Sequence, residues 1–228
     1  MSFSDGDFVK VDYSLWRMAD NQLMRTTDKK AAQDNGIYNE ETRYSPQLIV
    51  IGKDNALKAL WDAIKGMDVG ESRKLELGPK EAFGERDQNL VRVMPVADFR
   101  RRDINPTPGL QIDIDGVVAT VKSVNSGRVM VDANNPLAGE KIRYDITVVA
   151  KLDKEDEKVM SIAETYALEP ERVSVKGAEA MVTFGKKTRM NADYFINKTY
   201  MVNAVLQYMD ALKKVVVEEE YERSSEKK

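Results

Sequence analysis

The acidic residues spaced most like a cation-binding loop are Asp113 and Asp115, which are followed by Gly116. A calcium loop of this kind needs a glutamate six residues after its glycine, because that carboxylate closes the coordination sphere with both oxygens. Lys122 occupies that position, and Gln111 stands where a further acidic ligand would be needed. We therefore expect a hairpin turn here and no metal site.

Histidine and cysteine are both absent from the 228 residues. The chain therefore lacks the usual general base near neutral pH, the commonest transition-metal ligand and the thiol nucleophile. No nucleophile-elbow motif and no phosphate-binding P-loop occurs in the sequence. Hydrolysis and phosphoryl transfer are thus disfavoured, and we expect no cofactor. The side chains left to build a site are aromatic and apolar.

The charge pattern limits the partners. Lysine and arginine number 35 against 38 aspartates and glutamates, and the two signs are interspersed. A net charge of −3 without a basic stripe predicts no nucleic-acid partner. The sequence has no apolar run of about eighteen residues, so we expect no membrane span. Its first residues lack the basic and then apolar layout of a signal peptide, and we expect a cytoplasmic location.

The elements that must position any site begin with strands in residues 1–87. Residues 8–16 alternate between apolar and polar side chains, as a half-buried strand does. Shorter strands are predicted at residues 23–24, 48–51 and 71–77, each bounded by turn or glycine signals. This segment is therefore expected to be rich in β-structure.

Two helices are expected between these strands. Thr27 or Asp28 is suited to cap a short helix that Gly36 ends. Asn55 is suited to cap a longer helix over residues 56–65, in which the apolar side chains fall on one face.

Residues 88–137 have strand and turn signals of their own. The predicted elements are a strand at 90–94, a short helix at 96–99, and strands at 110–114, 117–124 and 128–131 that form two hairpins. The segment has too few apolar residues for a large core. We therefore expect apolar side chains to stay exposed, Met94 and Met130 among them, where unfolded chains can bind.

Residues 153–228 change in character. The predicted elements are a charged helix at 153–168 ended by Pro170, strands at 172–176 and 180–184, a long helix capped by Asn191 or Asp193 and running through Leu212, and a last strand at 215–221. The tail from residue 224 to 228 is expected to be disordered.

Five short segments carry a family resemblance, and they occur at residues 11–13, 52–53, 67–71, 82–84 and 144–148. In order and spacing they resemble the FKBP family of peptidyl-prolyl cis–trans isomerases. Residues 89–91, 93–99 and 132–139 resemble its SlyD-like branch and the long archaeal members, which carry an insert-in-flap chaperone domain. The resemblance covers about residues 5–151. The C-terminal segment resembles the extra domain of the long archaeal form through weaker motifs.

The resemblance implies an α+β fold with three domains. An FKBP-like antiparallel half-barrel wrapped on a helix is expected over residues 1–87 and 138–152. A small β-rich insert-in-flap domain is expected at 88–137, and an α+β domain at 153–228. The implied partners are unfolded or partly folded polypeptides that contain X–Pro bonds, and the C-terminal domain is expected to allow a homodimer.

The resemblance also implies a proline site and its chemistry. Tyr13, Phe83 and Tyr144 match the aromatic walls of the family's pocket, and Leu57 matches the residue whose backbone N–H binds a substrate carbonyl. Rotation about an X–Pro bond crosses a barrier of about 18–20 kcal/mol, because amide resonance must be broken. A dry aromatic pocket lowers that barrier without proton transfer, by removing water from the substrate carbonyl. Such a mechanism suits a chain without histidine or cysteine.

Further substrate contacts follow from the same resemblance. Ala56 is the neighbour of the carbonyl-binding residue, and Leu60 matches the floor of the pocket, where many relatives have Trp and SlyD-type proteins often have Leu. In the insert, Met94 and Phe99 are expected to contact the substrate.

One departure from the family pattern bears on activity. Met24 and Arg25 stand where the family commonly has a pocket Phe and an Asp. In relatives that carboxylate orients nearby polar groups, including the Tyr at the position of Tyr13. A guanidinium cannot accept a hydrogen bond, so Arg25 cannot replace that role directly, and Asp28 is the nearby carboxylate that would have to compensate.

Three hypotheses follow. The first is a prolyl isomerase whose insert captures unfolded chains, which raises the local concentration of prolines at the pocket. The second is a holdase chaperone with a degenerate isomerase site, which Met24 and Arg25 favour. The third is a structural or dimerisation module that rests mainly on residues 151–228.

Overall fold

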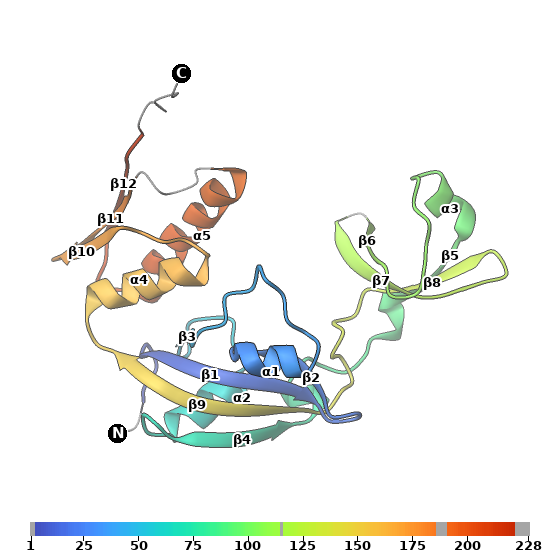
Figure 1. The fold of residues 1–228 in the computed structure, drawn as a ribbon, viewed down its shortest axis with the longest axis horizontal. Coiled ribbons are helices and arrows are strands. Elements are labelled where there is room, and N and C mark those ends of the chain that lie inside the picture. Colours follow the sequence, from blue (N-terminus) through green and yellow to red (C-terminus); the bar gives the residue numbers. More distant parts are fainter. Residues whose placement is uncertain (1–2, 115, 186–190, 222–228) are drawn as a thin grey trace. The chain divides into compact units, whose positions relative to one another are not determined.

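The computed structural model describes residues 3–114, 116–185 and 191–221 (Figure 1). The predicted turn residue Asp115 and the predicted disordered tail at 224–228 lie outside the described residues. Contacts divide the chain into two compact units, which are described in turn. The first comprises Met1–Trp16, Gln22–Leu75 and Arg143–Lys228, and the second comprises Arg17–Asn21 and Glu76–Ile142.

A five-stranded sheet forms the centre of the first unit. Its strands are β1 (Phe8–Arg17), β2 (Gln22–Thr26), β3 (Gln47–Val50), β4 (Ser72–Leu77) and β9 (Ile142–Leu152). The strand order is β2-β1-β9-β4, and β3 pairs with β1 in antiparallel register. Along β9, Tyr144, Ile146 and Val148 are buried while the residues between them are partly exposed, as expected for one buried face. The strand predicted over residues 8–16 is confirmed.

The short helix α1 (Lys29–Asp34) follows β2 directly. Its N-cap is Asp28, whose carboxylate accepts hydrogen bonds from the backbone N–H groups of Lys30 and Ala31. Of the two caps that the sequence allowed, Asp28 is therefore the one used.

Helix α2 (Lys58–Lys65) packs its apolar face inward, and its buried residues are Leu60, Ala63 and Ile64. The cap predicted at Asn55 is wrong, because the N-cap residue is Leu57 and no side chain caps the helix. The cause lies one residue earlier, at Asp54. The Asp54 Oδ1 accepts a hydrogen bond from the backbone N–H of Ala56 at 3.0 Å. This bond holds Ala56 in a turn before the helix begins.

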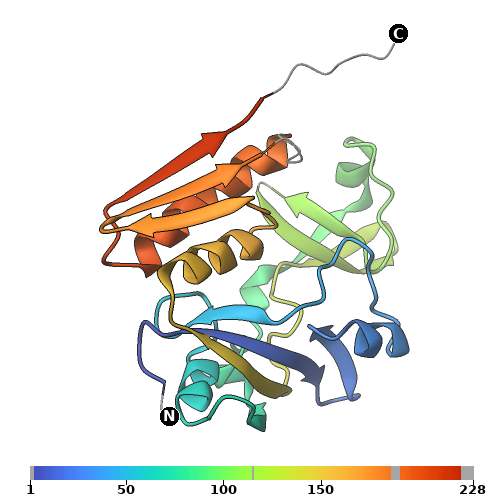
Figure 2. The ribbon, with the colours of Figure 1, turned by 60° about the vertical axis from the view of Figure 1, so that its left-hand side comes forward.

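The C-terminal part of the first unit is a second α+β layer (Figure 2). Its elements are α4 (Glu155–Thr165), β10 (Arg172–Lys176), β11 (Glu179–Phe184), α5 (Ala192–Tyr208) and β12 (Lys214–Glu219). Strands β10 and β11 form an antiparallel hairpin, whereas β12 pairs with β11 in parallel. A parallel pair needs a crossover connection, and α5 is part of it.

Two predicted helix bounds in this part are wrong. The first helix spans Glu155–Thr165 rather than 153–168, and Ala167 leaves the helix with a φ of +54°. Helix α5 is capped by Asn191 as one alternative predicted, but it ends at Tyr208 and not at Leu212. The chain turns there, and Leu212 is buried in the core instead of continuing the helix.

One hydrophobic core joins the C-terminal layer to the five-stranded sheet. Phe8 of β1 and Val50 of β3 are buried in the same cluster as the apolar side chains of α4, α5 and the β10–β12 sheet. Polar contacts reinforce this junction: Lys10 pairs with Glu164 at 2.7 Å, and Lys53 donates to the carbonyl oxygen of Tyr208 at 3.1 Å. The two layers therefore fold as parts of one body.

The second unit is a small antiparallel sheet with one short helix. Its elements are the single-turn helices η1 (Pro79–Glu81) and η2 (Gln88–Leu90), β5 (Val91–Pro95), α3 (Val96–Arg100), β6 (Gln111–Ile114), β7 (Val117–Asn125) and β8 (Arg128–Asp132). The strand order is β5-β8-β7-β6, and a register shift between Val121 and Ser123 marks a bulge. The buried core is small and consists of Phe99, Ile112, Ala119, Val121, Val129 and Val131.

Candidate functional site

Two tyrosines predicted to wall the pocket lie side by side on neighbouring strands. Tyr13 of β1 and Tyr144 of β9 have ring centroids 5.7 Å apart, with the rings tilted by 58°. Burial raises the pKa of the Tyr144 phenol to about 12, and the neighbouring Tyr13 adds to the shift. Both groups are therefore neutral hydroxyls near pH 7, suited to donate hydrogen bonds and not to act as bases.

Arg25 contacts this pair from β2. Burial raises the pKa of Tyr13, and the charge of Arg25, together with a hydrogen bond from its guanidinium to the phenol, offsets part of that rise. Asp28 does not take the place of the missing carboxylate, because its Oδ1 caps α1. Arg25 thus places a hydrogen-bond donor near the Tyr13 hydroxyl, where the family pattern implies an acceptor. Met24 is half-buried on the same strand.

Thr27, which directly follows β2, is hydrogen-bonded to β1 at Asp12 and Tyr13. Its hydroxyl donates to Asp12 Oδ1 at 2.7 Å and accepts from the backbone N–H of Tyr13 at 3.0 Å. The backbone N–H of Thr27 donates to the carbonyl of Tyr13, also at 3.0 Å. Sequence reasoning missed this role, although the position of Thr27 immediately before a helix cap was a usable signal.

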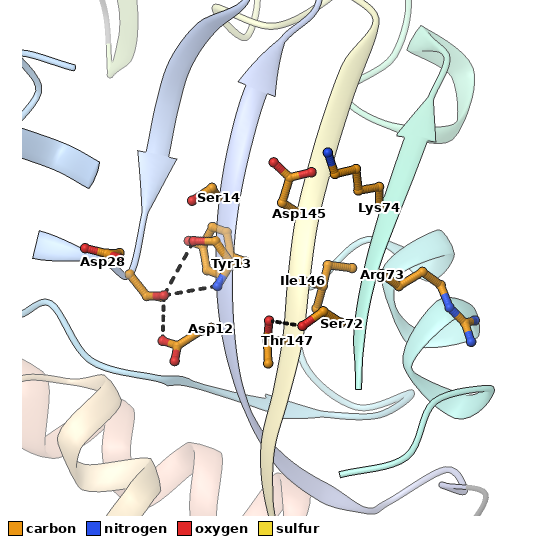
Figure 3. Close-up of a pocket in the computed structure, with 11 residues that line it drawn as sticks. Asp12, Tyr13, Ser14, Asp28, Ser72, Arg73, Lys74, Asp145, Ile146 and Thr147 are labelled. Atoms are coloured by element: carbon orange, nitrogen blue, oxygen red, sulfur yellow. Dashed lines mark hydrogen bonds between the residues drawn. The ribbon is translucent and has the colours of Figure 1, made fainter. Parts of the chain in front are cut away.

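Figure 3 draws a hollow of about 360 Å³ on the first unit. Its lining is mostly polar side chains of β1, β4 and β9, among them Asp12, Asp145 and Lys74. Ser72 and Thr147 share a hydrogen bond of 2.8 Å across it. Across the described ranges, no group of three or more acidic side chains is arranged to hold a metal ion.

The loop before α2 places the predicted carbonyl-binding group. Leu57 is half-buried, and its carbonyl oxygen accepts the first hydrogen bonds of the helix. Its own backbone N–H has no hydrogen-bond partner among the described residues. The N–H of Ala56 is already bound to Asp54, which also accepts from Trp61 Nε1 at 2.8 Å. Leu60 is buried, as a residue on a pocket floor should be.

Phe83 belongs to the second unit, follows η1 in the chain and is half-buried. The turn around it is tight. The N–H of Gly84 donates to the carbonyl of Pro79 at 2.7 Å, and Gly84 has a φ of +80°, which side chains other than glycine rarely adopt. Its carbonyl in turn accepts from the N–H of Gly139 at 2.8 Å, so the two chain segments that lead into the insert meet here.

Further contacts between these two connecting segments fix the base of the insert. Arg86 forms an ion pair with the buried carboxylate of Asp132. Asp87 donates its backbone N–H to Asn134 Oδ1 at 2.8 Å and accepts from Asn134 Nδ2 at 2.9 Å. The pKa of Asp132 is lowered: burial works to raise it, but hydrogen bonds from Asn134 and the charges of Arg86 and Lys122 prevail.

The substrate-contact residues predicted in the insert line a shallow depression. Phe99 is buried in the small core, and Met94 is half-buried against it. Both line the depression together with Ile104, Ile112 and Ile114.

The opposite face of the insert sheet carries exposed apolar side chains. Val93 and Met130 are cross-strand partners with exposed fractions of 57% and 40%, and Val118 is 61% exposed. The expectation that the insert exposes apolar side chains is confirmed for Met130 but not for Met94, which is half-buried because it packs against the small core. Patches of this kind mark surfaces that bind other chains.

The helices of the structure are short or carry charged and polar side chains. None of those in the described part of the chain has the length and apolar character that crossing a lipid bilayer requires.

Comparison with known proteins gives consistent matches. A family model described as FKBP-type peptidyl-prolyl cis-trans isomerase matches residues 2–100, and one described as FKBP26, IF domain, matches residues 92–137. The chain is 32% identical over 143 residues to the short-type peptidyl-prolyl cis-trans isomerase of Methanocaldococcus jannaschii, covering 63% of this chain and 90% of that protein.

Two bacterial proteins show the same similarity at lower identity. A probable FKBP-type 16 kDa peptidyl-prolyl cis-trans isomerase of Pseudomonas fluorescens is 27% identical over 110 residues, which cover 46% of this chain and 72% of that protein. The FKBP-type peptidyl-prolyl cis-trans isomerase SlyD of Escherichia coli is 26% identical over 130 residues, which cover 55% and 66% respectively.

Proposed function

The chain belongs to the family of FKBP-type peptidyl-prolyl cis–trans isomerases, and from this premise we propose that it isomerises X–Pro bonds in unfolded polypeptides. The single observation that carries the proposal is the pairing of half-buried Tyr13 with buried Tyr144, whose ring centroids are 5.7 Å apart and whose phenols have raised pKa values. These rings offer a proline an apolar wall and keep their hydroxyl protons at neutral pH. Phe83 keeps the role of flap aromatic that the family resemblance implies.

The proposed mechanism uses no proton transfer. The barrier of about 18–20 kcal/mol comes from amide resonance, which a polar solvent stabilises in the planar ground state. Moving the substrate carbonyl from water to an aromatic wall removes that stabilisation. The unpartnered N–H of Leu57 binds a substrate carbonyl, and the floor at Leu60 receives the proline ring.

Arg25 changes this site without removing its function. Because Arg25 can donate but not accept, it does not take up the Tyr13 proton, which is available to a substrate carbonyl. A charged donor also strengthens the phenol as a hydrogen-bond donor. The departure at this position therefore supports a retuned isomerase more than a degenerate one.

The insert supports a chaperone role beside the isomerase. Val93, Val118 and Met130 leave an apolar face that the small core of the insert does not use. We place the capture of unfolded chains on this face and on the depression beside Phe99. A holdase with a weak isomerase site is the alternative that this same observation favours, and the domain division at residues 88–137 goes with either.

Isomerisation of a proline-containing tetrapeptide tests the proposal. The full chain should accelerate it clearly, and Tyr13→Phe should lower kcat/KM by about two- to tenfold, the value of one hydrogen bond. Tyr38→Phe is the matched control, since Tyr38 is exposed and stacks on Tyr44 and not on Tyr13 or Tyr144. A rate equal to the uncatalysed one would leave the holdase as the function.

A further inference from the structure

A groove of about 350 Å³ runs within the first unit from the proposed proline site to the C-terminal layer. At one end it is lined by Tyr13 and Arg25, and at the other by Ser161, Glu164 and Thr165 of α4. One side is formed by residues of the loop at 41–48. The C-terminal segment therefore contributes to a hollow that begins at the residues of the isomerase site.

The charged groups along this groove differ in whether they have a partner of opposite charge. Glu164 pairs with Lys10 at 2.7 Å and with Arg43 at 3.5 Å, so it holds the loop and β1 against α4. Arg25 has no carboxylate partner among the described residues, and its contact is with the neutral Tyr13 phenol. The end of the groove at the proline site thus offers an uncompensated cation to a carbonyl or carboxylate.

An unpaired hydroxyl lies on the wall that α4 supplies. Ser161 is 3% exposed, and its Oγ has no hydrogen-bond partner among the described residues. Buried hydroxyls are nearly always satisfied, because leaving one unpaired costs about 1–3 kcal/mol. Ser161 also lines the groove, so a molecule bound there lies next to this unpaired hydroxyl.

We propose that this groove is a subsite for the polypeptide segment that flanks the isomerised X–Pro bond, and that the C-terminal segment is thereby part of the substrate site. An extended main chain alternates N–H and C=O groups. The groove offers both kinds of partner: donors on Arg25 and Arg43, and groups on Ser161, Glu164 and Thr165 that can accept. Continuity with Tyr13 selects the substrate chain as the occupant over an unrelated ligand. The inference rests on the proposed isomerase function.

A pair of threonines provides the test on the full chain. Thr165 is exposed in the groove and donates its hydroxyl to the carbonyl of Ser161 at 3.0 Å. Thr199 on α5 is also exposed and makes the same contact with Phe195 at 3.0 Å, but it does not line the groove. Thr165→Trp fills the groove, and Thr199→Trp is its matched control.

The readout is the gain in kcat/KM when a proline tetrapeptide is extended by several residues on both sides. We expect extension to raise kcat/KM by about two- to tenfold in the parent chain, the value of one or more added hydrogen bonds. Thr165→Trp should abolish the gain and leave the tetrapeptide value unchanged, whereas Thr199→Trp should keep both.

Ser161→Ala separates binding from a structural role. It removes the unpaired hydroxyl, so the chain should be as stable as the parent or more stable, yet it should lose part of the extension gain. An unchanged gain in both Thr165→Trp and Ser161→Ala would overturn the subsite. An equal loss on tetrapeptide and extended peptide would overturn it too, because the effect would then lie in the proline pocket. Absence of any tetrapeptide activity in the parent would instead refute the isomerase function itself.

Discussion

The insert sheet and the C-terminal layer are both additions in sequence to the same five-stranded sheet. They differ in where their apolar side chains are buried and in how many of these side chains stay exposed. The insert buries six residues in its own core and leaves Val93, Val118 and Met130 exposed. The C-terminal layer buries its apolar residues in a larger core that takes in Phe8 and Val50 of the five-stranded sheet.

This difference indicates two ways in which an added segment can contribute to the proposed function. A segment with its own core, joined by two paired connecting segments, can expose an apolar binding face without destabilising the five-stranded sheet. An addition that shares the core becomes part of the catalytic body and can supply fixed walls to its grooves. On this account the insert captures substrate, and the C-terminal layer aligns it.

The largest expected effect comes from truncating one aromatic residue in each core. Phe8→Ala removes a side chain shared by the five-stranded sheet and the C-terminal layer, so it should lower the free energy of unfolding of both by about 3–5 kcal/mol in one transition. Phe99→Ala should unfold the insert alone. Hydrogen exchange of each region at increasing denaturant concentration measures the free energy of unfolding region by region. If Phe8→Ala lowered the protection against hydrogen exchange in the C-terminal layer but not in β1, the claim of a shared core would be contradicted.

A smaller effect is expected from the flap aromatic. Phe83→Ala should reduce kcat/KM on a tetrapeptide by about tenfold or more, equivalent to about 1.4 kcal/mol of transition-state stabilisation. Because every substrate uses the proline pocket, activity in proline-limited protein refolding should fall by the same factor. Tetrapeptide activity equal to that of the parent would exclude Phe83 from the site.

The largest effect of pH on stability is expected in the C-terminal layer. Hydrogen bonds from Lys198, then from Tyr221 and Tyr194, lower the pKa of Glu219 from 4.5 to about 2. A depressed carboxyl pKa stabilises the fold above pH 4.5, and this contribution is lost as the pH falls from 4.5 toward 2.

Glu219→Gln should therefore be less stable than the parent at neutral pH, and the difference should close as the pH approaches 2. Denaturant titrations at a series of pH values measure it. The exposed neighbour Glu220 provides the control substitution Glu220→Gln. This variant should show the same dependence of stability on pH between 4.5 and 2 as the parent. A difference that stays constant with pH would contradict the assigned ion pair.

Local elements were predictable because their signals are local. The alternation over residues 8–16 marks β1, and Asp28 caps α1 as one of the two predicted choices. The wrong cap at Asn55 arose because Asp54, one residue earlier, bonds to Val50, Ala56 and Trp61 at once. A side chain with three partners of this kind cannot be recognised from spacing alone.

The candidate site was predictable only in part. The family resemblance named Tyr13 and Tyr144, and the structure brings the two rings together. The effect of Arg25 on the pKa of Tyr13 and the groove lined by α4 were not predicted. Both depend on contacts between residues far apart in the sequence, for which a single chain carries no signal.

The division between capture and catalysis is tested most directly by the triple substitution Val93→Ser, Val118→Ser and Met130→Ser. These side chains are exposed and lie outside the insert core, so the fold should persist. The measurement is the ratio of kcat/KM in proline-limited protein refolding to kcat/KM on a tetrapeptide. We predict that the ratio falls severalfold through the refolding value alone. An unchanged ratio would contradict the account.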